Sequence, residues 1–222
     1  MPVLLQPKAP FAADAILVGD PGRALLLAQE LLAQPKMCNH ARGLWGYSGV
    51  TPAGQELTIQ ATGIGAPSAA AVLADLAELG VRRAVRVGTA TGLDRQSRLG
   101  ELLLVAEAEA TEGSAAAFGI GVGEAVTPDA ALLDRLAEAV GGEARMARII
   151  STDTVPDPNR AAVGAAAADM QTLAVLAQGR SLGLATAALL AVVETSGELL
   201  TDAQLEETAK RAGGAVSRAL SG

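Results

Sequence analysis

The chain has 222 residues, half of them hydrophobic, and a formal net charge of −7. The length fits a single α/β domain over residues 1–222, and the acidic balance without a basic stripe argues against a general nucleic-acid binder. One cysteine rules out an intrachain disulfide, and the longest apolar run, 182–193, is too short to cross a bilayer. We therefore expect a cytoplasmic protein without membrane contact.

The first half of the chain alternates strand and helix signals. Residues 15–19 form a short apolar run that ends in glycine, as a buried strand does, and an amphipathic helix follows. Residues 45–51 and 56–62 flank a Pro-Ala-Gly turn and predict a hairpin. After a glycine turn at 63–65 we expect a helix from 66 to about 79, stopped by Gly80, and then a buried strand over 84–88.

The second half continues this alternation. Strands are expected at 101–106 and 148–151, and helices at 128–140, at 169–178 before Gly179, and at 202–220. Residues 184–194 are ambiguous, because their alanines favour a helix whereas their valines and flanking glycines permit a strand. The alternation predicts an α/β fold, with a central, largely parallel sheet covered by helices on both faces.

Two glycine-containing stretches lie where a strand gives way to a helix. The first, Gly19-Asp20-Pro21-Gly22-Arg23, combines helix-start amides with a guanidinium and could bind an anion. A plain strand-to-helix turn with a surface arginine explains it equally well. The second stretch, residues 62–68, is a glycine turn that leads into a helix, and on its own it indicates no more than a turn.

An arginine lies in the middle of an apolar strand, which is unusual. Arg86 stands within Val85-Arg86-Val87-Gly88-Thr89, and arginine is rarely buried without a partner. We favour a bound anion as that partner over a structural ion pair with an acid. The hydroxyl of Thr89 could donate to the same anion, whereas Arg82 and Arg83 follow a turn and are expected to be solvated.

The chain resembles the purine nucleoside phosphorylase and uridine phosphorylase family. Three stretches carry the resemblance in the right order, GDPGR from Gly19, TGIGAPSAAAVLADL from Thr62 and LGVRRAVRVGT from Leu79, together with Arg42. It is strong over 15–104 and thinner at 169–171 and 189–194. It implies a three-layer α/β/α sandwich with a mixed, partly barrelled sheet. It further implies a homo-oligomer built from dimers, often a hexamer, with sites shared across the dimer interface.

The resemblance also implies a reaction, the cleavage of a purine nucleoside by inorganic phosphate with no cofactor and no metal. The residues it assigns to phosphate are Gly19, Arg23, Arg86 and Thr89, with Arg42 supplied to a neighbouring subunit. Those it assigns to the nucleoside are Thr89, Ala90, Thr91, Val155, Asp169, Met170, Gln171 and Glu194. Catalysis would rest on Arg86 and Glu194, because phosphate stabilises positive charge developing on the sugar and an acid neutralises the departing base.

The sequence departs from the family in the base and ribose half of this site. The replacements are Thr91 for a glycine, Gln171 for a ribose-binding glutamate, Val155 and Pro156 for stacking aromatics, and Glu194 for an aspartate. The histidine that a neighbour normally lends to the sugar is absent, and Val3 or Gln6 stands near its place. The residues of the phosphate half match the family.

Three other functions stay open. Residues 62–65 and 77–80 look like those of uridine phosphorylases, but we find no Gln-x-Arg pair to read uracil, and Glu194 favours a purine. A nucleoside hydrolase would not need Arg23 and Arg86 together. From a different class, the chain could be a non-catalytic nucleoside- or phosphate-binding relative, an interpretation motivated by Gln171 and the missing aromatics.

Overall fold

The computed structural model describes residues 2–111, 113–159 and 164–221. The strands are β1 (Asp14–Val18), β2 (Ala33–Asn39), β3 (Gly46–Val50), β4 (Glu56–Ala61), β5 (Arg83–Gly92), β6 (Leu102–Ala110), β7 (Ala125–Val126), β8 (Ala144–Ser151), β9 (Ala167–Asp169), β10 (Ala185–Thr195) and β11 (Glu198–Leu199). The α-helices are α1 (Pro21–Leu31), α2 (Gly65–Glu78), α3 (Ala130–Val140), α4 (Thr172–Leu182) and α5 (Asp202–Leu220). Two short 3-10 helices are η1 (Ala41–Gly43) and η2 (Gly113–Phe118).

The strands join in one mixed sheet. From its outer edge, β2, β3 and β4 pair antiparallel, and β4, β1 and β5 pair parallel. Beyond β1, strand β5 pairs with both β10 and β9, and the ring closes through β6 and β8. Strands β5, β10, β6, β8 and β9 thus form a small closed barrel. The mixed, partly barrelled sheet that the resemblance implied is confirmed.

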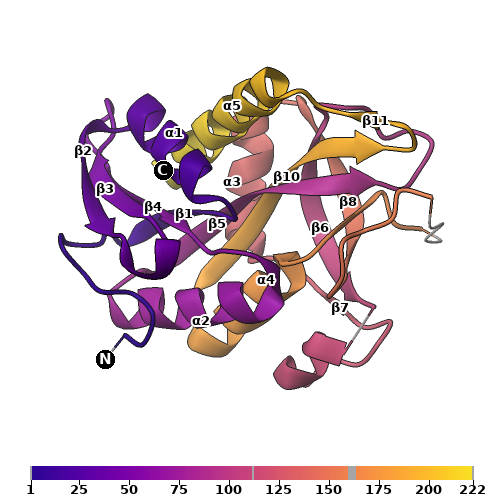
Figure 1. Cartoon of the computed structure of the whole chain (residues 1–222), viewed down its shortest axis with the longest axis horizontal. Helices are drawn as coiled ribbons and strands as arrows, with labels where there is room; N and C mark the ends of the chain where they lie inside the picture. The colour runs from indigo at the N-terminus through magenta and orange to yellow at the C-terminus, as the bar shows by residue number, and fades with distance from the viewer. Residues whose placement is uncertain (1, 112, 160–163, 222) are drawn as a thin grey trace.

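Helices cover both faces of the sheet and give three layers (Figure 1). Helices α1, α3 and α5 pack together on one face, and α2 and α4 pack together on the other. Because the chain has few aromatic residues, each core is aliphatic. Under α1, α3 and α5 it includes Ile16, Leu27, Val85, Leu136 and Val216; under α2 it includes Leu17, Leu73, Leu76 and Val175.

Local sequence explains where the helices begin and end. Asp20 caps α1 by accepting a hydrogen bond from the amide of Arg23, and Pro21 fits the first turn because it lacks an N–H there. Thr201 and Gln204 form a capping box at the start of α5. Gly141, left-handed with φ 55°, ends α3 at the predicted residue. No helix in the described part of the chain is long and apolar enough to cross a membrane.

The structure corrects the expected helix at 169–178. Residues 167–169 form β9 instead, and α4 runs from Thr172 through Gly179 to Leu182. Gly179 does not stop the helix because its role is packing: a Cβ there would lie 2.4 Å from Cγ2 of Thr186, so glycine lets α4 lie close to β10. The ambiguous segment 184–194 is the strand β10.

The expectation that Arg83 is solvated is also wrong. It lies at the start of β5, where its Nε donates to Oδ1 of Asp14 over 2.6 Å and one terminal nitrogen donates to the carbonyl oxygen of Leu220. The hydrogen bond to the carboxylate raises the pKa of the Arg83 guanidinium, although its partial burial opposes this. The pair ties the start of β5 to β1 and to the end of α5.

Candidate active site

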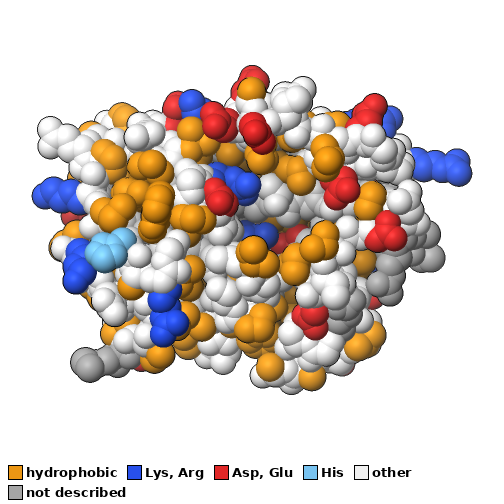
Figure 2. Space-filling view, viewed as in Figure 1, with side chains coloured by type: hydrophobic (Ala, Val, Ile, Leu, Met, Phe, Trp, Pro, Cys, Tyr) orange, Lys and Arg blue, Asp and Glu red, His pale blue; other side chains and the backbone are white. Residues whose placement is uncertain are grey.

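A cavity of 710 Å³ opens where β1, β5 and β9 end. The residues predicted for the site that line it are Gly19, Arg23, Arg86, Thr89, Ala90, Thr91, Val155, Asp169, Met170 and Gln171. Figure 2 shows basic and acidic side chains at the bottom of a hollow in the middle of one face, with hydrophobic side chains beside it. The structure therefore gathers segments that are far apart in the sequence around one space.

Arg23 enters the cavity from the first turn of α1. Pro21 has no N–H, and the amide of Arg23 is already bonded to the Asp20 carboxylate at 2.8 Å. The start of this helix therefore offers few free amides to an anion, and its guanidinium is the main donor. Burial lowers the pKa of Arg23, the Asp20 carboxylate opposes that change, and the positive charge of Arg86 lowers the pKa further.

Arg86 reaches the same cavity from the middle of β5 and is 5% exposed. Its Nη2 donates to Oδ2 of Asp169 at 3.0 Å, its Nη1 donates to Oε1 of Gln171 at 2.7 Å, and its Nε donates to Asp169 and to the hydroxyl of Thr172, each at 3.2 Å. The acid partner that we had considered less favoured than a bound anion is thus present. A guanidinium has five N–H donors, so one on each terminal nitrogen is left by these contacts.

A glycine makes room for this guanidinium. Gly88 lies two residues after Arg86, on the same face of β5. A Cβ at Gly88 would lie 2.7 Å from Cζ of Arg86 and 2.7 Å from Cδ2 of Leu190. Carbon atoms do not approach so closely, and so the arginine side chain can lie along the strand only because residue 88 has no side chain.

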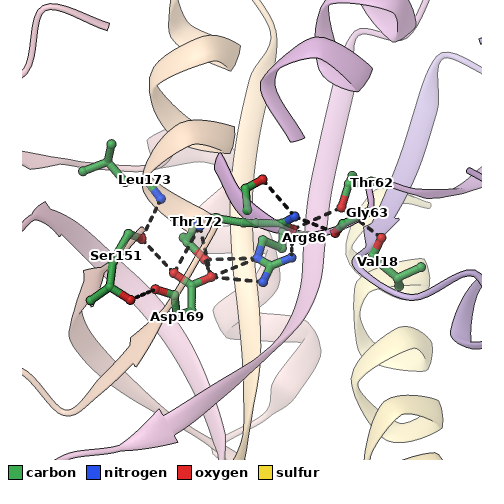
Figure 3. A network of polar contacts seen from close by, with 11 residues as sticks. Val18, Thr62, Gly63, Arg86, Ser151, Asp169, Thr172 and Leu173 are labelled. Carbon is green, nitrogen blue, oxygen red and sulfur yellow. Dashed lines mark hydrogen bonds and ion pairs between the residues drawn. The ribbon is translucent and has the colours of Figure 1, made fainter. Parts of the chain in front are cut away.

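Asp169 is fully committed to bonds within the protein (Figure 3). Its Oδ1 accepts from the hydroxyl of Ser151 at 2.7 Å, and its Oδ2 accepts from the hydroxyl of Thr172 at 2.7 Å as well as from Arg86. The amide of Thr172 also donates to it, at 3.0 Å. With its side chain wholly buried, this carboxylate neutralises Arg86 and holds it in place.

Gln171 joins Arg86 to the glycine turn before α2. Its Oε1 accepts a hydrogen bond from Nη1 of Arg86 and another, at 3.1 Å, from the hydroxyl of Thr62. Its Nε2 donates to the carbonyl oxygens of Gly63 at 2.7 Å and Gly65 at 3.2 Å. Both glycines have positive φ, 74° and 79°, which other residues rarely adopt.

Two predicted residues do not line the cavity. Glu194, in β10, is outside the lining, and its Oε2 accepts a hydrogen bond at 3.0 Å from the hydroxyl of Thr91, which does line the cavity. Arg42 is exposed on η1, in a left-handed conformation with φ 58°, outside this cavity. The chain itself therefore does not bring Arg42 to Arg23 and Arg86.

Sequence reasoning missed several residues of the site. Ser151 and Thr172 support Asp169, and Gly88 frees the space for Arg86. Ile64, 83% exposed, lines the cavity as the predicted Val155 does, which is 79% exposed, and the two make part of its wall apolar. Of these residues, only Gly88 could have been found from the sequence, because strand residues two apart share a face and Gly88 is two residues after Arg86.

The described residues favour binding of an anion. Two guanidiniums that influence each other electrostatically face one cavity, and the hydroxyl-bearing Thr89 lines the same space. A dianion between the arginines would relieve their mutual repulsion and use their remaining donors. Within the described residues, no three His, Cys, Asp or Glu side chains come together as a metal site.

Comparisons with known proteins agree on one family. The family model for the phosphorylase superfamily matches residues 14–222. A purine nucleoside phosphorylase DeoD-type of Oceanobacillus iheyensis is 29% identical over 187 residues, 82% of this chain and 79% of that protein. The protein of the same name from Alkaliphilus metalliredigens is 29% identical over 208 residues, 89% of this chain and 87% of that protein. The one from Levilactobacillus brevis is 36% identical over 134 residues, 59% of this chain and 56% of that protein.

Proposed function

Because this chain belongs to the phosphorylase superfamily, we propose that it is a purine nucleoside phosphorylase. It would cleave a purine ribonucleoside or 2′-deoxyribonucleoside with inorganic phosphate, giving the free base and the sugar 1-phosphate. The observation that carries this proposal is the pair of guanidiniums, Arg23 and Arg86, which face one cavity of 710 Å³. The names of the similar proteins support the choice of a purine nucleoside.

Phosphate lies at the arginine end of the cavity in this proposal. The free N–H groups on the two terminal nitrogens of Arg86 form a fork that suits two phosphate oxygens, while Arg23 and the hydroxyl of Thr89 donate to the others. Gly19, at the end of β1, allows the anion to approach the backbone. Because Arg86 is already held by Asp169 and Gln171, little side-chain entropy is lost when phosphate binds.

The nucleoside occupies the rest of the cavity, with its sugar near Met170 and its base against Ala90, Thr91 and Val155. A phosphate oxygen attacks the anomeric carbon as the bond to the purine nitrogen breaks, and the electrons of that bond pass to the base. Glu194 supplies the proton that neutralises the base. Because the hydroxyl of Thr91, which lines the cavity, donates to the carboxyl group of Glu194 at 3.0 Å, Glu194 would have to exchange this hydrogen bond for one to the base.

We also propose that the active unit is a homo-oligomer with shared sites. Arg42 is exposed and lies outside the cavity of its own chain. In a symmetric dimer each Arg42 would reach the phosphate bound by the other subunit, as isologous contacts create two equivalent sites. A third cation would then complete the charge needed to bind a phosphate dianion.

A panel of nucleosides tests the function. Purified protein is incubated with inosine, adenosine, guanosine and uridine, each with and without phosphate, and the free base and sugar 1-phosphate are measured. Purine release that requires phosphate is the expected result. Equal cleavage without phosphate would indicate a hydrolase, release from uridine alone would indicate a uridine phosphorylase, and ligand binding without base release would indicate a non-catalytic relative. Each of these three results contradicts the proposal.

A further inference from the structure

Every polar atom of the Gln171 side chain is engaged within the protein. Its Oε1 accepts from Nη1 of Arg86 at 2.7 Å, and its Nε2 donates to the carbonyl oxygens of Gly63 and Gly65. The residue is 3% exposed. An arginine only donates and a backbone carbonyl only accepts, so these partners fix which end of the amide is oxygen and which is nitrogen.

We infer that Gln171 is a positioning residue for Arg86, which ties the guanidinium to the glycine turn before α2 and takes no part in holding the sugar. This inference rests on the proposed function, and it revises the ribose-binding role that family resemblance implies for this position. To bond a sugar hydroxyl, Gln171 would have to release a charged donor or uncover buried carbonyl oxygens. Either exchange costs more than one neutral hydrogen bond returns.

The geometry explains why this residue is an amide and not a carboxylate. The Nε2 position lies 2.7 Å from the oxygen of Gly63 and 3.2 Å from that of Gly65. A glutamate would place a negative oxygen against these two acceptors, and the turn would open. Asp169 already neutralises Arg86, so a second carboxylate is not needed for charge and would cancel part of the attraction for phosphate.

The glycine turn at residues 63–65 affects the site because it forms part of the cavity lining. Gly63 and Gly65 line it together with the exposed Ile64, and Ile64 precedes α2 without a side-chain cap. In Figure 3 Arg86 lies between Asp169 on one side and Thr62 and Gly63 on the other. Gln171 thus joins Arg86 to a turn that contains two left-handed glycines, and its hydrogen bonds hold both in place.

Two variants of Gln171 separate positioning from sugar binding. Gln171→Met keeps the size and removes both polar functions, and Gln171→Glu keeps an acceptor for Arg86 but removes the donor. Gln29→Glu, on the exposed side of α1, makes the same chemical change away from the site. The kinetic readouts are the KM for phosphate and the kcat/KM ratio of inosine to 2′-deoxyinosine and to 3′-deoxyinosine; calorimetry with inorganic phosphate measures its affinity without turnover.

For a positioning residue, both Gln171 variants should weaken phosphate binding by about tenfold to a hundredfold, the value of a hydrogen bond to a charged group. Their inosine-to-deoxyinosine ratios should stay within about twofold of wild type, and Gln29→Glu should change nothing. Unchanged phosphate affinity with a ratio shifted about tenfold would overturn the inference, because the lost contact would then be to a hydroxyl.

Thermal unfolding first establishes which variants are folded, and wild-type protein gives a measurement that needs no variant. If wild-type protein discriminates against both deoxyinosines by more than about a hundredfold, a side chain of the site must bind the sugar hydroxyls. Asp169 and Gln171 flank Met170, and Asp169 is fully bonded. Gln171 would then be the residue that binds them, and the inference would be overturned. If wild-type protein releases no base, the proposed function fails, yet calorimetry with phosphate still decides the role of Gln171.

Discussion

Gly88→Ala tests whether the absence of a side chain on β5 positions Arg86. The new methyl group would lie 2.7 Å from both Cζ and Nη2 of Arg86 and 2.7 Å from Cδ2 of Leu190. Both neighbours are buried, and the guanidinium is fixed by Asp169 and Gln171. Both contacts are too short, so Leu190 and Arg86 share the displacement, and its cost depends on which of them moves further.

If Leu190 moves, the cost is that of overpacking a core, about 1–3 kcal/mol of unfolding free energy. If Arg86 moves, its ion pair with Asp169 breaks and leaves a wholly buried carboxylate without its cation, which costs about 3–5 kcal/mol. Leu190 is an apolar side chain with several rotamers, whereas Arg86 has four hydrogen-bonded contacts. We therefore expect a loss nearer the smaller range, with a strained guanidinium and a raised KM for phosphate.

Urea unfolding and phosphate kinetics measure both effects. Gly113→Ala is the matched control, because a Cβ at Gly113 meets no atom within 4 Å. Leu190→Ala combined with Gly88→Ala removes the contact with Leu190 but keeps the contact with Arg86, so the raised KM for phosphate should persist. A Gly88→Ala protein as stable as wild type, with unchanged KM, would refute the argument that residue 88 must be a glycine to seat Arg86.

Glu194→Gln should lower kcat for inosine by about 10²–10⁴-fold, the usual yield of general acid catalysis, and a nitrophenyl riboside, whose leaving group needs no proton, should lose far less; equal losses would remove Glu194 as the acid. Inactive Arg42→Ala and Arg86→Ala proteins, mixed under conditions where subunits exchange, should regain activity through hybrid sites, and no recovery would contradict a shared site. Burial raises the pKa of the Cys38 thiol, and hydrogen bonds from neighbouring groups offset this only in part. Less thiolate is therefore present at neutral pH, and a thiol reagent should modify native protein much more slowly than urea-unfolded protein. Equal rates would show that Cys38 is accessible.

Elements with local signals could be predicted from the sequence. The hairpin of β3 and β4 follows from its turn residues, and α5 was expected at its observed bounds, 202–220. Strand β2 was not expected, because most of its residues are exposed and Gln34 has a positive φ of 49°. Its strand conformation depends on pairing with β3, which no short window of sequence contains.

The same division holds for the candidate site. Arg86 was found because a charge in an apolar strand needs a partner, but that partner lies 83 residues away in the sequence and could not be identified from spacing. Family resemblance placed Asp169 and Gln171 near the sugar, whereas the structure bonds both to Arg86. Side-chain hydrogen bonds between distant segments depend on how the barrel closes, and local sequence patterns do not predict them.

The closure of the barrel through β10 has a consequence for synthesis on the ribosome. Strand β5 is made long before β9 and β10, its neighbours in the closed ring. At about 5–20 residues per second, the 83 residues between Arg86 and Asp169 take roughly 4–17 s to translate. The nascent chain therefore carries an arginine whose acid has not yet been made, and a fragment ending before β9 should be unable to bury it.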